Sequence, residues 1–200
     1  MKPVNDFTGV TALNAMCLDL LNSEERDWHG GGAPTVDRLD DAEWRAGFVA
    51  RWASSAPVGA AAWQALRRVR PVLRRAVEEL SATGRLGETA LGALNAELAA
   101  LAWRERIVTG TDGRYRLQDE PDAGPDAMAG MAVRSLAGLL AEAEPERLKV
   151  CANSDCRWAF YDESKNHRRR WCDATACGNL MKVRRFRQRH RQGPASPSRG

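Results

Sequence analysis

Four of the five cysteines lie near the C-terminus, in two pairs with the same internal spacing. The first pair is Cys151 and Cys156, and the second is Cys172 and Cys177, so each pair encloses four residues. Four thiolates complete a tetrahedral Zn²⁺ site that has no open coordination position, and a short turn can bring both sulfurs of a pair to one metal. The spacing therefore predicts one structural zinc ion held by these four cysteines.

Other chemistries for the same cysteines are disulfides, an iron–sulfur cluster or unrelated free thiols. Disulfides fit poorly, because the N-terminus lacks the pattern of a secretory signal peptide. The usual spacings of iron–sulfur ligands are absent. A catalytic zinc needs an open position, and no metalloprotease or deaminase motif is found. The nearby His167 and His190 are expected to be bystanders, since four cysteines already fill the site.

Positive charge is concentrated around and after the cysteines. Residues 147–191 contain thirteen Lys and Arg against four Asp and Glu, whereas residues 1–146 contain sixteen against twenty-two. A basic segment on an acidic body is typical of a protein in which only the basic segment meets a polyanion. The residues predicted to contact nucleic acid are Lys165, Arg168, Arg169, Arg170, Lys182, Arg184, Arg185, Arg187, Arg189 and Arg191.

The second cysteine pair leads directly into a predicted helix at about 178–191. On that helix Val183, Phe186 and His190 fall within one narrow sector, with Leu180 at its edge, at 100° per residue. We expect this sector to pack on the zinc site and the arginines to lie on its flanks, where they can pair with phosphate or guanine.

The rest of the chain must carry this basic segment, and its pattern is mainly helical. Apolar residues at helical spacing predict helices over 8–22, 40–54, 58–80, 88–102 and 126–141. Thr8 is the predicted N-cap of the first helix, and Asp40 or Asp41 is the predicted N-cap of the second. Cys17 lies on the apolar face of the first helix and is expected to be a buried thiol. Trp44, Phe48 and Trp52 form a stripe that is expected in the core. Pro71 should kink or split the third helix, and Gly84 and Gly87 mark its end.

Strand patterns are fewer. The turn Thr111-Asp112-Gly113 between 106–109 and 115–117 predicts a β-hairpin, with a linker at 119–125. A short strand at 148–150 leads to Cys151, and a second hairpin is expected over 158–171. The fold class is therefore α+β, mostly α: a helical N-terminal domain with a hairpin, and a small zinc finger resembling a treble clef.

The body offers few candidates for ligand binding. Asn22, His29 and Asn95 are the polar residues that could line a pocket, although Asn95 is equally consistent with a satisfied core amide. The glycine-rich stretch 28–34 is predicted to be a plain loop, because no Gly-Lys-Ser/Thr follows it. No nucleophile–base pair is recognisable, so we do not expect an enzyme. No apolar run is long enough to span a membrane, and a cytoplasmic location is expected.

Several motifs resemble the CGNR zinc finger of bacterial proteins, and Leu18-Asp19-Leu20-Leu21-Asn22-Ser23 with Leu94-Asn95 resembles the ABATE domain that precedes it. The finger motifs are Val150-Cys151, Phe160-Tyr161-Asp162-Glu163-Ser164, Arg169-Arg170-Trp171-Cys172 and Cys177-Gly178-Asn179-Leu180. The motif's final arginine is Leu180 here, and Asp173-Ala174 replaces the usual Ser-Met. The resemblance implies an ABATE-like domain over 1–144 and a finger over 145–192 with the four cysteines as ligands. We expect the first domain to sense a signal or to dimerise. The tail over 193–200 is rich in Pro, Ser and Gly and is predicted to be disordered.

The resemblance implies a transcription regulator that binds double-stranded DNA close to the nucleoid, with a small-molecule effector and a homodimer as further expectations. Two alternatives stay open. The same basic surface could bind RNA, which would require exposed aromatic side chains that stack on bases. The body could instead bind a small molecule, with the finger as a structural or protein-contact module.

Overall fold

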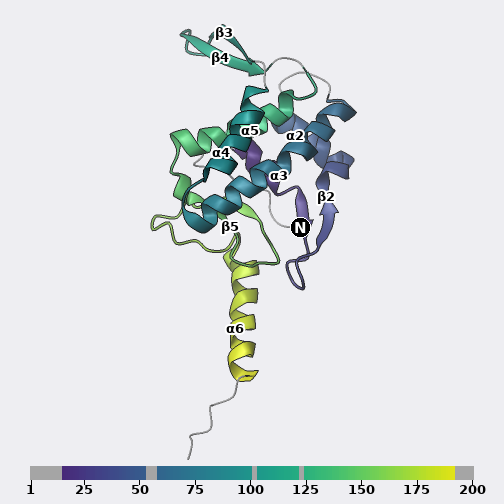
Figure 1. Cartoon of the computed structure of the whole chain (residues 1–200), viewed down its shortest axis with the longest axis vertical. Coiled ribbons are helices and arrows are strands. Elements are labelled where there is room, and N and C mark those ends of the chain that lie inside the picture. The colour runs from purple at the N-terminus through teal and green to yellow at the C-terminus, as the bar shows by residue number, and fades with distance from the viewer. Residues whose placement is uncertain (1–14, 53–57, 101–102, 122–123, 192–200) are drawn as a thin grey trace, which may run out of the picture.

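The computed structural model describes residues 15–52, 58–100, 103–121 and 124–191 (Figure 1). The predicted start of the first helix at 8–14 and the tail at 193–200 lie outside these ranges. The fold is mainly helical, as expected, and it contains three two-stranded antiparallel ribbons, of which β1–β2 was not predicted. The elements are α1 Met16–Leu21, β1 Glu24–Arg26, β2 Pro34–Asp37, α2 Ala42–Trp52, α3 Ala60–Thr83, α4 Glu88–Ala99, β3 Trp103–Thr109, β4 Tyr115–Pro121, α5 Ala127–Glu142, β5 Leu148–Val150, β6 Ala159–Tyr161 and α6 Asn179–Arg191.

The short helix α1 lies at the centre of the body, against α3 and α5. Five of its six residues are buried, because it is apolar on nearly every side. Cys17 is fully buried as expected, its backbone N–H donates to the Ser135 hydroxyl at 3.1 Å, and burial raises the pKa of its thiol to about 12. Asp19 is the one residue of α1 that is only partly buried, and its carboxylate accepts from the Trp52 indole at 2.9 Å, which ties α1 to α2.

Helix α3 is the longest element, and the prediction that Pro71 splits it is wrong. It runs unbroken for 24 residues with Pro71 inside. Burial of one complete face, which includes Leu66, Val69 and Leu73, outweighs the single backbone hydrogen bond that proline removes. The helix ends where expected, at Gly84, whose left-handed φ of 77° lets its N–H bond to the Leu80 carbonyl.

Helices α2 and α4 cover the body from the outside. The Asp41 carboxylate caps α2, accepting from the backbone N–H of Glu43 at 2.9 Å and of Trp44 at 3.2 Å. Phe48 is buried in the core and stacks on Trp44 with 4.8 Å between ring centroids, which confirms the core stripe. On α4 Leu94 is buried, whereas Leu91 is 43% exposed.

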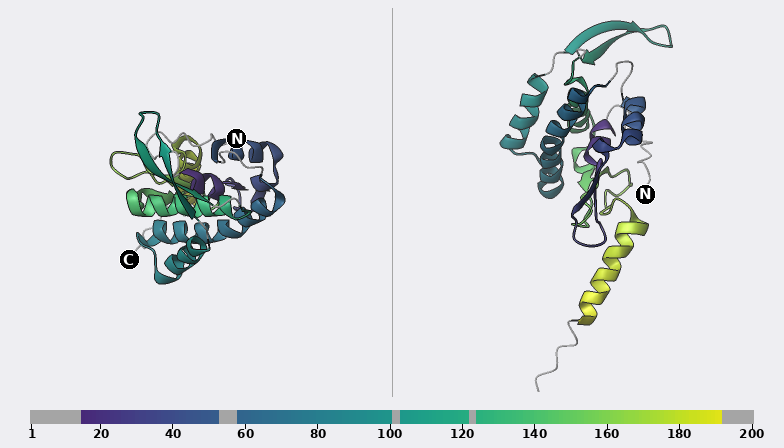
Figure 2. Two further views of the ribbon diagram at one scale, coloured as in Figure 1. Left: turned by 90° about the horizontal axis from the view of Figure 1, so that it is seen from above. Right: turned by 90° about the vertical axis from the view of Figure 1, so that its right-hand side faces the viewer.

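The β3–β4 hairpin projects from the end of the body opposite α6 (Figures 1 and 2). The predicted turn is confirmed, with Gly110 N donating to the Arg114 carbonyl at 2.8 Å. The ribbon is longer than expected, because β4 continues to Pro121, into the predicted linker.

Strands β5 and β6 join the finger to the body. The strand at 148–150 is confirmed, and it pairs with β6 so that Val150 lies opposite Ala159. The prediction of a hairpin over 158–171 is wrong. Strand β6 pairs with β5, the strand that precedes it in the sequence, and residues 162–171 form a loop. Leu148 and Ala159 belong to the core of the body, because β5 packs against α3. Among the described helices, none combines the length and apolar character that crossing a bilayer requires.

Candidate zinc centre and basic helix

Three short backbone turns place the four cysteines. Cys151 follows β5, and its N–H donates to the Trp158 carbonyl at 2.9 Å, which closes the first loop. Cys156 N–H donates to the Asn153 carbonyl at 2.9 Å inside that loop. Cys177 lies in a wide helical turn, Ala174–Gly178, that runs directly into α6. The Asp173 carboxylate caps this turn by accepting from the backbone of Thr175 at 2.7 Å and of Ala176 at 2.9 Å.

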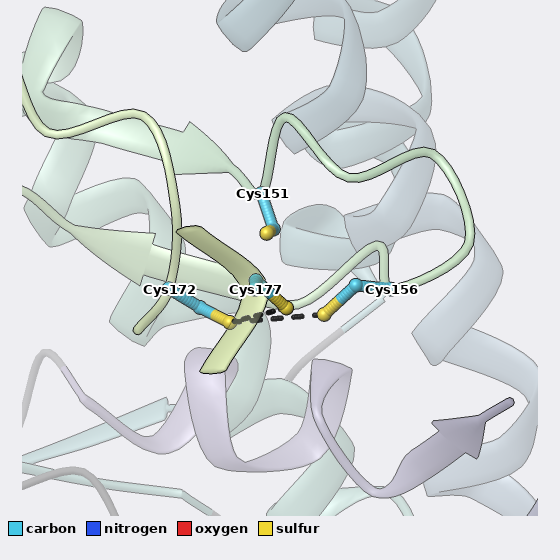
Figure 3. Close-up of side chains that lie close together, drawn as sticks. All are labelled: Cys151, Cys156, Cys172 and Cys177. Carbon is cyan, nitrogen blue, oxygen red and sulfur yellow. Dashed lines mark hydrogen bonds between the residues drawn. The ribbon is translucent and has the colours of Figure 1, made fainter. Parts of the chain in front are cut away.

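The four sulfurs converge on one point (Figure 3). All four are buried and lie within 4.8 Å of one another. The distance is 3.7 Å from Cys156 Sγ to Cys172 Sγ and 3.8 Å from Cys172 Sγ to Cys177 Sγ. A tetrahedron with Zn–S bonds of about 2.3 Å has edges of about 3.8 Å. The donor set and its spacing therefore fit one structural zinc ion with four thiolate ligands, as predicted.

The crowding of the sulfurs also favours a cation between them. Hydrogen bonding to the Cys156 thiol raises the pKa of Cys151 to about 12, and contact with Cys151 and Cys156 raises the pKa of Cys172. Neighbouring thiolates repel one another in a buried site, so the protons stay on unless a metal replaces them. The zinc ion is then part of the finger's folding, since it neutralises charges that nothing else in the cluster can neutralise.

A second layer of side chains supports the ligand loops. Asn153 is fully buried, and its amide N–H approaches Cys177 Sγ at 3.8 Å while also donating to the Trp28 carbonyl at 2.9 Å. Trp171 packs over Gly178, where an added Cβ would lie 3.5 Å from the indole ring. The arginine at 169 braces the third ligand, because its guanidinium donates to the Trp171 and Cys172 carbonyls.

Asp162 organises the loop between β6 and Cys172. Its fully buried carboxylate accepts from Lys149 Nζ at 2.6 Å, from Arg169 N at 2.9 Å and from the Ser164 hydroxyl at 2.5 Å. Burial by itself would raise the pKa of this carboxyl, but the hydrogen bonds from Lys149 and Ser164 outweigh it and lower the pKa to about 2. Asp162 is therefore a permanent anion that fixes the loop.

The glycine-rich loop between β1 and β2 lies against the finger. Gly32 has a left-handed φ of 66°, and a Cβ there would meet the Asp155 backbone at 2.8 Å. Trp28 packs on the cysteine cluster, and the His29 carbonyl accepts from Arg184 of α6 at 2.6 Å. The loop predicted from sequence is thus a strap that holds the finger, and the finger's own backbone approaches the strap at Gly32.

Two further sets of contacts, which we call clamps, connect the finger to the body. The sequence analysis did not predict either set. The buried Asn22 side chain pairs with both backbone groups of Ala159, each at 2.9 Å, as a neighbouring strand would. Arg74 of α3 donates to the Arg157 carbonyl at 2.7 Å and to the Leu21 carbonyl, while Glu78 pairs with the Arg157 guanidinium. No local sequence pattern predicts such contacts, because their partners are 53 or more residues apart in the clamp from α3 and 137 apart at Asn22.

The three candidate ligand residues do not share one site. Asn22 uses its amide on Ala159, as just described. His29 is exposed in the strap, where its ring lies on Trp28 with 3.5 Å between centroids. Asn95 is exposed on α4, so it is not a satisfied core amide, and its role in ligand binding stays a prediction.

Helix α6 projects from the body as a rod, and only its beginning touches the finger (Figure 2). Its predicted apolar sector does not pack on the zinc site: Val183 is 45% exposed, Phe186 is 56% exposed, and His190 is exposed and rests on Phe186. The finger's small core is already filled by the four cysteines, Phe160 and tryptophans, so it leaves no surface for the later turns of α6.

The basic residues divide into two groups. Arg184 is used within the protein, because it pairs with Asp155 at 2.7 Å, and Arg169 braces the zinc ligands. The others are exposed, and Arg170 and Arg185 flank the Trp171 ring at 5.5 and 5.8 Å, which joins the loop and the helix into one basic surface. The exposed members are Lys165, Arg168, Arg170, Lys182, Arg185, Arg187, Arg189 and Arg191.

Comparison with protein-family models gave two matches. The CGNR zinc finger model matches residues 147–190, and the ABATE model, described as "putative stress-induced transcription regulator", matches residues 14–143. No curated protein matched the chain. The two matched segments meet at the region between α5 and β5, and the ligand set of the finger is the cysteine cluster in Figure 3. The chain belongs to the ABATE family and carries a CGNR zinc finger in its last third.

Proposed function

We propose that this protein is a transcription regulator that binds double-stranded DNA through α6 and the adjoining loop 168–170. One observation carries the proposal: α6 stands free of the body with six Lys and Arg and no Asp or Glu. Only Arg184 among these six has an ion-pair partner among the described residues. Five cations on one exposed helix repel one another, and a polyanion relieves that repulsion.

The finger supports this use by holding α6 at a defined angle. The wide turn at Ala174–Gly178 makes the helix start at a zinc ligand, and Arg184 ties the second turn to Asp155. A helix presented in this way has the diameter that the major groove admits, and arginines on it can reach both phosphate and base edges. Sensing by the body would act on α6 through the strap and the clamps. We propose that the chain acts by binding and not by catalysis.

RNA is the second candidate partner of the same surface. Single-stranded RNA recognition uses exposed aromatic rings that stack on bases. Phe160 is buried under Arg169, and the Tyr161 hydroxyl accepts from the Glu144 backbone at 3.2 Å. These two rings serve the finger's own packing, which favours duplex DNA as the partner. Phe186 of α6 is 56% exposed and is the ring that RNA bases would stack on, so the two nucleic acids are compared directly.

The test is fluorescence anisotropy with duplex DNA and with single-stranded RNA at several salt concentrations. We expect tighter binding to duplex DNA and a log–log salt slope of about −0.9 for each neutralised phosphate. The variant Arg185→Ala/Arg187→Ala/Arg189→Ala should weaken binding and make the slope shallower by up to about 3. Arg75→Ala, which removes an exposed arginine of α3, is the matched control and should bind as the wild type does. Equal affinity for both nucleic acids, or an unchanged slope in the triple variant, would contradict the proposal.

A further inference from the structure

The β3–β4 hairpin, which we call the arm, exposes an apolar face that nothing in the described chain covers. Ile107 is 73% exposed, Leu117 is 68% exposed and Tyr115 is 79% exposed. Ile107 lies directly opposite Leu117 in the ribbon, and Tyr115 is two positions from Leu117, so all three side chains lie on the same face. These are the three largest exposures among the large apolar residues of the described chain.

Such an arm is unusual for a monomer in water. An isolated two-stranded ribbon is marginally stable, and it normally needs a third strand or a packed face. Here the arm extends beyond the helices, and although α5 contacts β4, the side chains of Ile107, Tyr115 and Leu117 stay exposed (Figure 2). A contiguous exposed apolar face on a projecting element indicates an interaction surface.

The geometry of β4 shows how another strand could add to the arm. Gly110 N donates to the Arg114 carbonyl, and antiparallel ladders alternate, so the even-numbered residues of β4 bond to β3. The backbone N–H and C=O of Tyr115 and Leu117 then point to the outer edge of the arm. This edge carries Leu117 at its centre, with the apolar face on one side of it.

We propose that the arm is a dimerisation element, in which β4 pairs antiparallel with β4 of a second copy of this chain, with Leu117 on the two-fold axis. This pairing joins the two ribbons into one four-stranded sheet. Across that sheet the apolar residues form a continuous row, in the order Ile107, Leu117, Leu117 of the second copy and Ile107 of the second copy. Each Tyr115 lies diagonally beside the second copy's Leu117.

The charge order of β4 favours this self-pairing. Basic residues precede Leu117 and acidic residues follow it in the sequence, so an antiparallel copy places opposite charges across the axis. Arg114, the turn residue before β4, and Glu120 stand three positions either side of Leu117, so a two-fold axis at Leu117 sets each opposite the other's copy, twice in the dimer. The outer edge of β3 lacks this property: centring it on Ile107 sets Arg106 opposite Val108 and Glu105 opposite Thr109. Charge pairing between two copies is therefore favourable at the β4 edge and not at the β3 edge.

The first experiment measures the mass of the zinc-loaded protein by sedimentation velocity over a range of concentrations, without nucleic acid. We expect a dimer for the wild type and a dissociation constant roughly a hundredfold weaker for Leu117→Asp, which removes the central apolar contact and sets two like charges on the axis. Leu91→Asp, at an apolar residue of α4 that is 43% exposed, is the matched control and should stay dimeric. A monomeric wild type, or a Leu117→Asp protein that dimerises as tightly as the control, overturns the proposal.

A charge exchange tests the register. Arg114→Glu and Glu120→Arg should each weaken the dimer by about tenfold, because each sets like charges opposite one another twice. A mixture of the two variants should form a heterodimer, and the double variant Arg114→Glu/Glu120→Arg should regain the wild-type affinity. If the double variant stays as weak as the single ones, the pairing is not the one proposed.

A disulfide test is independent of affinity. Leu117→Cys should cross-link the two copies under mild oxidation, because residues opposite each other on the axis have Cα atoms about 5.5 Å apart. Tyr115→Cys should not cross-link, because its two copies lie four residues apart along the strands, well beyond the 7 Å limit. Equal cross-linking of both variants would overturn the axis at Leu117. Dimers or arm protection that appear only when DNA is added would make the arm a nucleic-acid contact and would likewise overturn the proposal.

Discussion

Helices α3 and α6 are both rich in arginine and both carry apolar residues at helical spacing, yet the protein uses them in opposite ways. Four of the five arginines of α3 have partners in the body: for example, Arg70 pairs with Asp37 at 2.6 Å, and Arg74 donates to two carbonyls. On α6, Arg187 and Arg189 are exposed on a rod that leaves the body. Arginine content therefore does not identify a nucleic-acid surface; the supply of nearby acceptors does.

The apolar residues show the same contrast. Leu66, Val69 and Leu73 of α3 are fully buried, whereas Val183 and Phe186 of α6 are about half exposed. Helix α3 is stabilised along its whole length by tertiary packing. Helix α6 depends on its first turn, which begins at a zinc ligand, because a helix of 13 residues is marginal by itself.

Removal of zinc should have the largest effect, and of the two helices it should affect α6 and not α3. Chelation, or Cys172→Ser, leaves buried sulfurs without a cation, and structural zinc supplies most of the folding free energy of a small finger. We expect the amides of 179–191 to lose protection in hydrogen exchange, while those of 60–83 keep it. Protection of α6 that survives chelation would show that the helix has a second source of stability.

Truncation of apolar side chains should have the next largest effect, and it should destabilise the protein far more in α3 than in α6. Leu73→Ala should lower the free energy of unfolding by about 2–5 kcal/mol, because the removed atoms leave a cavity in the core. Phe186→Ala should change it by less than about 0.5 kcal/mol, because the ring is already in water. Urea denaturation of both variants measures the difference. A large loss in Phe186→Ala would mean that α6 packs on something in solution.

Removal of arginines should also destabilise the protein more in α3 than in α6, with smaller changes in the free energy of unfolding. Arg74→Ala leaves the Leu21 and Arg157 carbonyls without their donor, and we expect a loss of about 2 kcal/mol in unfolding free energy. Arg187→Ala should leave stability unchanged within about 0.5 kcal/mol and weaken DNA binding. Equal losses in the two variants would remove the distinction between structural and functional arginines.

The smallest effect concerns Asp162, which holds the loop beside α6. Asp162→Asn should cost about 1–2 kcal/mol of finger stability, because it removes charged hydrogen bonds to Lys149 and to the Arg169 backbone. The folded-state pKa is lowered to about 2, so the stabilisation is fully present above the ordinary value of 3.8 and is lost only as pH falls towards 2. Thermal unfolding of the zinc-loaded protein should therefore show the same difference from wild type at every pH between about 5 and 8. A difference that varies within that range would assign the effect to another group.

The chemistry of the zinc site was determined by the sequence alone. Four cysteines in equal pairs limit the metal and its coordination, and the structure places their sulfurs at the edge length that zinc requires. The helices of the body and the turn of the arm were also predicted, because apolar spacing, the Asp41 cap and Asp112-Gly113 act locally. Local patterns are sufficient wherever the partners are close in sequence.

Tertiary structure decided how the finger is held and which residues are left for a partner. Pro71 does not break α3, because burial along a whole helix exceeds the loss of one hydrogen bond. The strap, Asn22 and Arg74 join segments that are far apart in the sequence, so no local pattern could assign them. The apolar sector of α6 has the spacing of a buried face, but packing needs a second surface, and the finger's small core is already filled. Helical periodicity predicts which side chains share one face of a helix. Only the tertiary structure shows whether another element covers that face.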